Sequence, residues 1–237
     1  MNLFFSTDLA PCPYLDNRLE RRLVVSLEDD AEPGHHDRLV LAGFRRSQNY
    51  AYRPTCPGCN ACVPIRIPVE RFIFSRSWRR TLRHNGDLRT EHKASRATEE
   101  QFNLFRDYLG SRHANGGMAA MGWNEYRTMV EESPSSSQIV EWRSDDERLI
   151  GVSITDYLSS GLSGVYKFFD PAETKRSLGT LIILWHVQRA LELKLPYVYL
   201  GYWIANSPKM DYKARFRPLE QLTNLGWQAM PFKEEAG

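Results

Sequence analysis

The sequence predicts an α+β protein built from two domains. Apolar residues make up 42% of the 237 positions, which is enough to form a sizeable core. The apolar pattern changes near residue 96, from short runs interrupted by proline and cysteine to longer helical and strand-like periods. We therefore expect a cysteine-bearing N-terminal domain over residues 1–96 and a mixed-sheet domain over residues 97–237.

The second domain is expected to begin with two helices. Thr98 is a candidate N-cap, and Gln101 follows at the spacing of a capping box. Apolar residues then repeat along one helical face at Phe102, Phe105 and Leu109. Residues 115–122 predict a loop, and residues 123–132 predict a short second helix.

Strand-like patterns follow the two helices. Residues 137–171 contain three β-rich runs separated by two polar turns, which predicts an antiparallel meander. Residues 178–194 predict a long apolar helix. Residues 197–204 are a nearly continuous run of aromatic and β-branched side chains, as expected for a strand buried on both faces. A last strand near residues 226–232 is expected to close the domain.

This order of elements is that of the GNAT type of acyltransferase fold. CoA-dependent enzymes of that type carry an Arg/Gln-x-x-Gly-x-Gly/Ala loop before the long helix, where backbone amides hold the pyrophosphate. Arg176 and Gly179 match this pattern, but Leu181 stands where glycine or alanine belongs. Its bulky side chain opposes close approach of a pyrophosphate. The fold predicts acyl transfer, and the loop argues against CoA as the donor.

Three of the four cysteines lie at three-residue intervals in the N-terminal domain. Cys56, Cys59 and Cys62 have the spacing of metal ligands, and Cys12 could supply a fourth thiolate. Four thiolates suit a structural zinc ion or an iron–sulfur cluster. Small buried thiols around a turn are the alternative interpretation.

Positive charge is concentrated in one part of the chain. The net charge is only +2, but Arg38 to Lys93 contains 12 Lys and Arg against 3 acids, a net of +9. Eleven of these 12 cations are arginine, whose planar group binds phosphate or carboxylate through paired hydrogen bonds. We expect an anionic partner here, with a solvated basic face as the alternative.

One segment of this basic region predicts a helix with a cationic face. Its arginines lie at three- and four-residue offsets, at Arg76, Arg79, Arg80 and Arg83. Such a face could bind phosphate or carboxylate, or it could be a solvated surface.

Several classes of protein are disfavoured by what the sequence lacks. No window approaches 18 consecutive apolar residues, and the first residues lack the pattern of a secretory signal, so we expect a cytoplasmic protein without a membrane span. There is no HExxH motif and no recognisable Ser/His/Asp arrangement. His35 and His36 are expected to lie in an exposed loop.

The motifs taken together resemble the arginyl-tRNA–protein transferase family, most closely its bacterial leucyl-transferring branch. The matching segments occur in the same order from about residue 12 to residue 227: CPYLDNR, GFRRSQNYAYRPTCPGCNACVPIRI, SRSWRRTLRHNGDL, SRHANGGM, YKFFDP, RSLGT and YVYLGYWIANSPKMDYKARFRPLE. One departure is Trp78, where a polar residue is expected.

The resemblance implies transfer of leucine from Leu-tRNA to the α-amino group of proteins that begin with Asp or Glu, marking them for degradation in the N-degron pathway. Arginine from Arg-tRNA is the alternative donor, and a CoA-dependent N-acetyltransferase is a more remote alternative. A non-enzymatic RNA-binding protein with a zinc-like knuckle is a third. An α-amino group has a pKa of about 7.7 to 8.0, so a useful fraction is already neutral at pH 7. We expect orientation and oxyanion stabilisation to accelerate the reaction, with no cofactor required.

These expectations assign candidate residues to three roles besides the four cysteines. The candidate catalytic residues are Tyr166, Asp170 and Tyr202. The candidate site for the acidic N-terminus of the acceptor is formed by Arg76, Arg79 and Arg80. The candidate tRNA-binding residues are Arg45, Arg46, Arg53, Arg66, Arg176, Lys209, Lys213 and Arg215.

Overall fold

The computed structural model describes residues 3–27, 34–112, 118–132 and 136–231. In this part of the chain, an eight-stranded mixed sheet lies beside a four-stranded antiparallel sheet, with a two-stranded ribbon and several helices. The α+β class predicted from the sequence is therefore confirmed. None of the described helices combines the length and apolarity needed to cross a bilayer.

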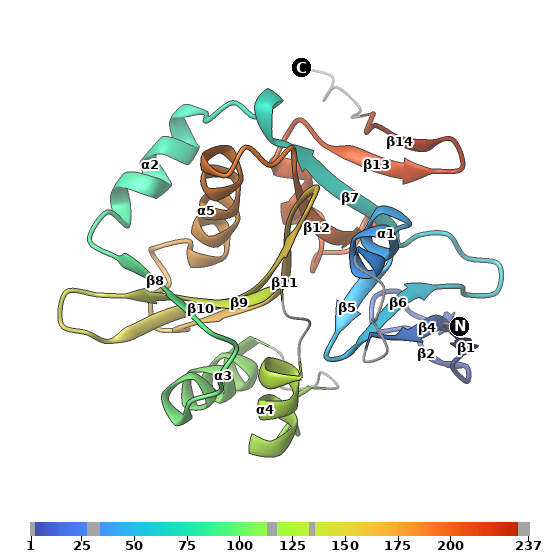
Figure 1. Ribbon diagram of the computed structural model, residues 1–237, viewed down its shortest axis with the longest axis horizontal. Helices are drawn as coiled ribbons and strands as arrows, with labels where there is room; N and C mark the ends of the chain where they lie inside the picture. The colour runs from blue at the N-terminus through green and yellow to red at the C-terminus, as the bar shows by residue number, and fades with distance from the viewer. Residues whose placement is uncertain (1–2, 28–33, 113–117, 133–135, 232–237) are drawn as a thin grey trace.

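The eight-stranded sheet is the centre of the molecule (Figure 1). Its strands follow the order β14, β13, β7, β12, β11, β10, β9, β8. Strands β11 and β12 are parallel, and the other printed pairings of this sheet are antiparallel. The bounds are β7 Val63–Pro68, β8 Arg89–Lys93, β9 Ser137–Arg143, β10 Leu149–Leu158, β11 Gly161–Phe169, β12 Tyr197–Trp203, β13 Glu220–Thr223 and β14 Gly226–Ala229.

The C-terminal strands match the sequence prediction closely. Strands β9, β10 and β11 form the predicted antiparallel meander. Strand β12 is the predicted buried strand, and β14 coincides with the predicted last strand. These segments were predictable because their apolar periods are long and are separated by clear turn residues.

Helices cover both faces of the large sheet (Figure 1). Helix α5 (Leu178–Glu192) and helix α2 (Arg76–His84) lie on one face, where α5 packs on β7, β11 and β12. Helix α3 (Glu99–Arg112) and helix α4 (Trp123–Glu131) lie on the opposite face, against β9, β10 and β11. The predicted long helix and both predicted helices of the second domain are thus confirmed.

The start of α3 has the capping geometry that the sequence predicts. The backbone N–H of Gln101 donates to Thr98 Oγ1 at 3.2 Å, and the backbone N–H of Thr98 donates to Gln101 Oε1 at 3.2 Å. The loop predicted over residues 115–122 lies partly outside the described residues, and its described part begins with a turn at 118–120.

The N-terminal segment forms a smaller module against β11, β12 and β7 (Figure 1). Its four-stranded sheet has the order β1, β4, β6, β5, and helix α1 follows β4 in the chain. The bounds are β1 Phe4–Ser6, β2 Ala10–Pro11, β3 Leu19–Glu20, β4 Arg22–Ser26, α1 His35–Leu41, β5 Arg45–Ser47 and β6 Tyr50–Pro54.

Residues 63–93 cross from this module into the large sheet. They supply β7, which lies between β12 and β13, then α2, and then β8 at the sheet edge. Residues on both sides of the expected boundary at 96/97 therefore contribute strands to one sheet. The division into two domains remains a prediction.

Candidate active site

Strands β11 and β12 separate partway along their length. They pair over Gly161–Ser163 and Tyr197–Tyr199, although β11 continues to Phe169 and β12 to Trp203. Beyond this point the facing backbone edges of the two strands do not pair with each other, at the position where open sheets with parallel strands commonly bind ligands. We call this opening the splay.

Two cationic side chains reach into the splay and satisfy its backbone carbonyls. Arg45 of β5 donates from Nη2 to the Val165 carbonyl on β11 at 2.7 Å. Lys213, in the 3₁₀ segment Asp211–Arg215, donates from Nζ to the Leu200 carbonyl at 2.8 Å and to the Tyr202 carbonyl at 2.6 Å. The two side chains therefore hold the edges of β11 and β12 in place.

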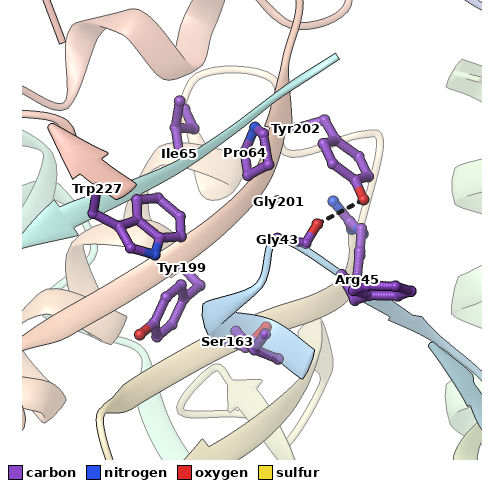
Figure 2. Close-up of a pocket in the computed structure, with 11 residues that line it drawn as sticks. Gly43, Arg45, Pro64, Ile65, Ser163, Tyr199, Gly201, Tyr202 and Trp227 are labelled. Atoms are coloured by element: carbon purple, nitrogen blue, oxygen red, sulfur yellow. Dashed lines mark hydrogen bonds between the residues drawn. The ribbon is translucent and has the colours of Figure 1, made fainter. Parts of the chain in front are cut away.

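Gly201 makes room for Arg45 at this point. It lies at a register shift of β12 and has φ of 69°, a conformation that favours glycine. A Cβ atom at this position would collide with the Arg45 guanidinium. Figure 2 shows Arg45 pointing toward Gly201, next to the Tyr202 hydroxyl.

A third cation, Lys167 of β11, lies next to Arg45. Its Nζ donates to the Gly179 carbonyl at 3.0 Å and lies 5.3 Å from the centroid of the Tyr212 ring. Burial, reinforced by the charge of Arg45, lowers the pKa of Lys167 to about 7. Burial, with the charges of Arg45 and Lys167, holds the pKa of Lys213 well below its usual value.

Arg45, Lys167 and Lys213 are named the splay cluster. Among the described residues, none of the three forms an ion pair with Asp or Glu within 4.0 Å. Cations gathered without a counter-charge are unusual away from functional sites.

Tyrosine hydroxyls complete the site. Tyr166 of β11 lies between the splay and α3, and its ring packs 5.9 Å from Phe105. Desolvation raises the pKa of Tyr166 and Tyr212 above the ordinary value, which already lies well above neutral pH, so both hydroxyls are protonated and can donate hydrogen bonds.

The three predicted catalytic residues differ in their surroundings. Tyr166 lies at the splay, as an oxyanion donor would need to. Asp170 pairs with Arg148 at 3.0 Å and accepts a hydrogen bond from the Ala172 backbone N–H at 2.8 Å. The Tyr202 hydroxyl lies 2.9 Å from the Gly43 carbonyl and 3.0 Å from the Tyr52 carbonyl. The contacts of Asp170 and Tyr202 are therefore structural in this conformation.

Two residues expected to bind tRNA are enclosed by the protein, which corrects that expectation. Arg46 is 3% exposed and pairs with Asp156 at 2.8 Å. Arg66 is 6% exposed, pairs with Glu220 at 2.8 Å and lies over the Tyr197 ring at 3.4 Å. Their partners are far away in sequence, so counting local charge could not identify these pairs.

Arg176 also has protein partners. It forms two 2.8 Å hydrogen bonds with Asp87 and one of 3.0 Å with Glu173. Its guanidinium anchors the turn before α5 to the end of α2, instead of pointing freely to solvent.

The remaining candidate tRNA residues lie at the surface. Arg53 lies over the Phe44 ring, Lys209 contacts the Pro13 carbonyl at 3.4 Å, and Arg215 lies over the Trp78 ring. All three are exposed to solvent.

The predicted basic helix is α2. Ser75 caps it by accepting from the Trp78 backbone N–H at 3.3 Å, and Trp78 is buried in a stack 4.9 Å from Phe216. A tryptophan therefore serves packing at the position where a polar residue was expected. The exposed arginines of α2 lie on its outer side: Arg76, Arg79, Arg80 and Arg83.

The N-terminal fold brings the cysteines near one another. Burial and the nearby Cys56, Cys12 and Cys59 thiols raise the pKa of Cys62 to about 12. Within the described residues, however, no three His, Cys, Asp or Glu side chains have the arrangement of a metal site. The donor set suits zinc but its geometry here does not, so metal binding remains a prediction.

Metal analysis of the purified protein would test this prediction. If the four cysteines share a metal, the purified protein should contain about one equivalent of zinc or a coloured cluster. The Cys59→Ala variant should then lose both the metal and thermal stability. A metal-free protein with full stability would make these thiols packing residues.

Histidines occupy positions that the sequence did not indicate. His35 and His36 are buried in α1 instead of lying in an exposed loop, and His36 Nε2 is 3.6 Å from Asp156. His186 of α5 lies within hydrogen-bond distance of Thr155 Oγ1 at 2.9 Å, and burial lowers its pKa to about 3.

Lys167 is the main site residue that sequence reasoning missed. It interrupts the apolar and aromatic run of β11, and a lysine inside such a strand was an available signal.

The family models match most of the chain. The N-terminal model of arginine-tRNA-protein transferase matches residues 10–80, and the C-terminal model matches residues 100–223. The chain belongs to the arginine-tRNA–protein transferase family.

Curated relatives extend over nearly the whole chain. An aspartate/glutamate leucyltransferase of Paramagnetospirillum magneticum is 48% identical over 227 residues, covering 96% of this chain and 93% of the relative. One of Parvibaculum lavamentivorans is 49% identical over 228 residues, covering 96% and 95%.

The comparison with solved structures gave matches of low sequence identity. FemX has a TM-score of 0.47 at 9% identity and covers 79% of this chain and 64% of its own. A tandem GNAT protein from the clavulanic acid biosynthesis pathway has a TM-score of 0.44 at 11% identity, covering 98% and 65%.

Proposed function

We propose that this protein is an aminoacyl-tRNA–protein transferase that moves leucine from Leu-tRNA to the α-amino group of proteins beginning with Asp or Glu. The observation that carries the proposal is the 48% identity to an aspartate/glutamate leucyltransferase over 96% of this chain. Its place in the cell would be the cytoplasm, where charged tRNA is made.

The splay is the proposed reaction centre. The neutral α-amine attacks the aminoacyl ester carbonyl, a C–N bond forms, and the ester C–O bond to the tRNA ribose breaks, with the proton lost by the nitrogen ending on the departing ribose oxygen. The negative charge that develops on the carbonyl oxygen needs donors already in place. The Tyr166 hydroxyl is suited to that role, because Tyr166 lies on the part of β11 that borders the splay and its hydroxyl is protonated at neutral pH.

The start of α5 supports an ester donor over CoA. Leu181 is 6% exposed and packs among Val140, Ile150 and Leu178 instead of opening a cradle. The turn before the helix is tied down by Arg176. A pyrophosphate would have to displace these contacts, whereas an aminoacyl ester on the ribose of tRNA brings no pyrophosphate to this point.

The exposed cations suit the tRNA backbone. Phosphate contacts are made mostly by surface Arg and Lys, and they add affinity without reading sequence. We assign this role to the arginines of α2 and to Arg53, Lys209 and Arg215.

Donor choice is the test of the leucyl assignment. With an acceptor peptide beginning with Glu, we expect leucine to be transferred from Leu-tRNA at least about tenfold more efficiently than arginine from Arg-tRNA, a difference of about 1.4 kcal/mol. Initial rates with each charged tRNA measure this ratio. Equal use of both donors would contradict the leucine assignment and leave the reaction class intact.

A further inference from the structure

We propose that the splay cluster of Arg45, Lys167 and Lys213 is a carboxylate-binding site that takes the acidic side chain of the acceptor's first residue. The proposal rests on the proposed function, since it assigns a specificity site to that same reaction. It moves the expected acid pocket from α2 into the splay.

When its members are protonated, the cluster carries positive charge that no carboxylate of the described residues offsets. Arg45 acts electrostatically on both lysines, and Lys167 acts on Lys213. Within the described part of the chain no carboxylate pairs with any of them. Mutual repulsion disfavours this charged state, and a bound anion would relieve it.

The ionisable neighbours of Lys167 supply no negative charge. Arg45 approaches from β5, Lys213 and Tyr212 from the 3₁₀ segment, and His186 from α5. Burial raises the pKa of Tyr212 and lowers that of His186 to about 3, so both are uncharged near pH 8. A ligand is therefore the available source of a counter-charge.

Position favours this cluster over α2. In Asp or Glu only a few covalent bonds separate the side-chain carboxylate from the α-amino group that reacts. A site that reads the carboxylate must therefore lie beside the reaction centre. Arg45 and Lys213 contact the splay edges directly, whereas α2 lies on the outer side of α5 (Figure 1).

Burial also helps this site to discriminate between acidic and neutral acceptor side chains. Lys213 is 5% exposed, and a bound carboxylate would stabilise the protonated form of such a buried amine, whereas a neutral side chain would not. The exposed arginines of α2 keep their hydration whether the acceptor is acidic or neutral, so they would discriminate less.

Binding of an acidic acceptor should be coupled to proton uptake. Lys167 has a pKa of about 7 in the free protein and is mostly neutral at pH 8. A carboxylate beside it raises that pKa, and the site then takes up a proton. A glutamine side chain does not have this effect.

Calorimetry measures this coupling directly. The full chain, with uncharged tRNA present, would be titrated at pH 8 with peptides that begin with Glu or Gln, in two buffers of different ionisation enthalpy. Both peptides carry an α-amino group, so a difference in proton uptake between them reports on the splay cluster. We expect the Glu peptide to bind more tightly and to take up a larger fraction of a proton.

Variants connect the uptake to Lys167. Lys167→Met should remove the extra proton uptake and reduce the preference for Glu over Gln in kcat/KM by about tenfold or more. The matched control is Lys175→Met, because Lys175 is an exposed lysine outside the splay. This control should keep both the extra proton uptake and the preference for Glu over Gln.

Three outcomes would overturn the assignment: equal proton uptake with the two peptides in the unaltered chain, an unchanged Glu preference in folded Lys167→Met, or a loss in that variant confined to tRNA affinity. The last would identify a phosphate as the anion.

The calorimetric comparison stands without the variant if Lys167→Met does not fold. Absence of transfer to every peptide would refute the proposed reaction, while the Glu and Gln binding difference would still decide the carboxylate site.

Discussion

Asp156→Ala is expected to lower the free energy of unfolding by about 3 to 5 kcal/mol, because it leaves a buried guanidinium without its counter-charge. Arg46 donates to both carboxylate oxygens of Asp156, at 2.8 and 2.9 Å. It also donates to Ser137 Oγ at 2.9 Å and to the Gln48 carbonyl at 2.8 Å. This network joins β5 of the N-terminal module to β9 and β10 of the large sheet.

Urea denaturation of the unaltered protein and of Asp156→Ala measures the loss in free energy of unfolding. Glu192→Ala is a suitable control, since Glu192 is 63% exposed and its pair with Arg189 should contribute no more than about 1 kcal/mol. A loss below about 1 kcal/mol for Asp156→Ala would show that the buried pair does not stabilise the junction.

Removal of the α2 arginines is expected to have the second large effect, on tRNA binding. A variant with Gln at Arg76, Arg79, Arg80 and Arg83 should bind tRNA more weakly. The slope of the logarithm of its tRNA-binding constant against the logarithm of salt concentration should become shallower by about 0.7 to 0.9 for each lost phosphate contact. Its stability should change little, because these side chains are exposed.

Binding titrations at several salt concentrations give the slope. Arg127→Gln is the control, because Arg127 is an exposed arginine on α4, on the other face of the sheet. An unchanged slope in the four-residue variant would exclude α2 from the tRNA surface. A loss of Glu over Gln preference with unchanged tRNA affinity would instead support the acid pocket first expected on α2.

The sequence predicted those parts of the fold whose signals are local. The capping pair of Thr98 and Gln101, the meander and the apolar period of α5 each require only neighbouring residues. The insertion of β7 between β12 and β13 was not predictable, because strand pairing over more than 100 residues leaves no local pattern.

The same limit applies to the candidate site. Arg46 and Arg66 have arginine's usual anion preference, but their anions are carboxylates of this chain, 110 and 154 residues away. Arg45 and Lys213 were placed on the tRNA surface, yet the fold brings them to the splay beside Lys167. Tyr166 and Tyr202 both lie on strands that border the splay, but the Tyr202 hydroxyl is hydrogen-bonded to the Gly43 and Tyr52 carbonyls.

Mass spectrometry of transfer products detects the proposed reaction itself. Peptides beginning with Glu, Gln and N-acetylated Glu would be incubated with Leu-tRNA and the unaltered protein. We expect one added leucine at the free α-amino group of the Glu peptide, far less on the Gln peptide and none on the acetylated peptide. Equal addition to the Glu and Gln peptides, or transfer from acetyl-CoA in place of Leu-tRNA, would contradict the proposed function.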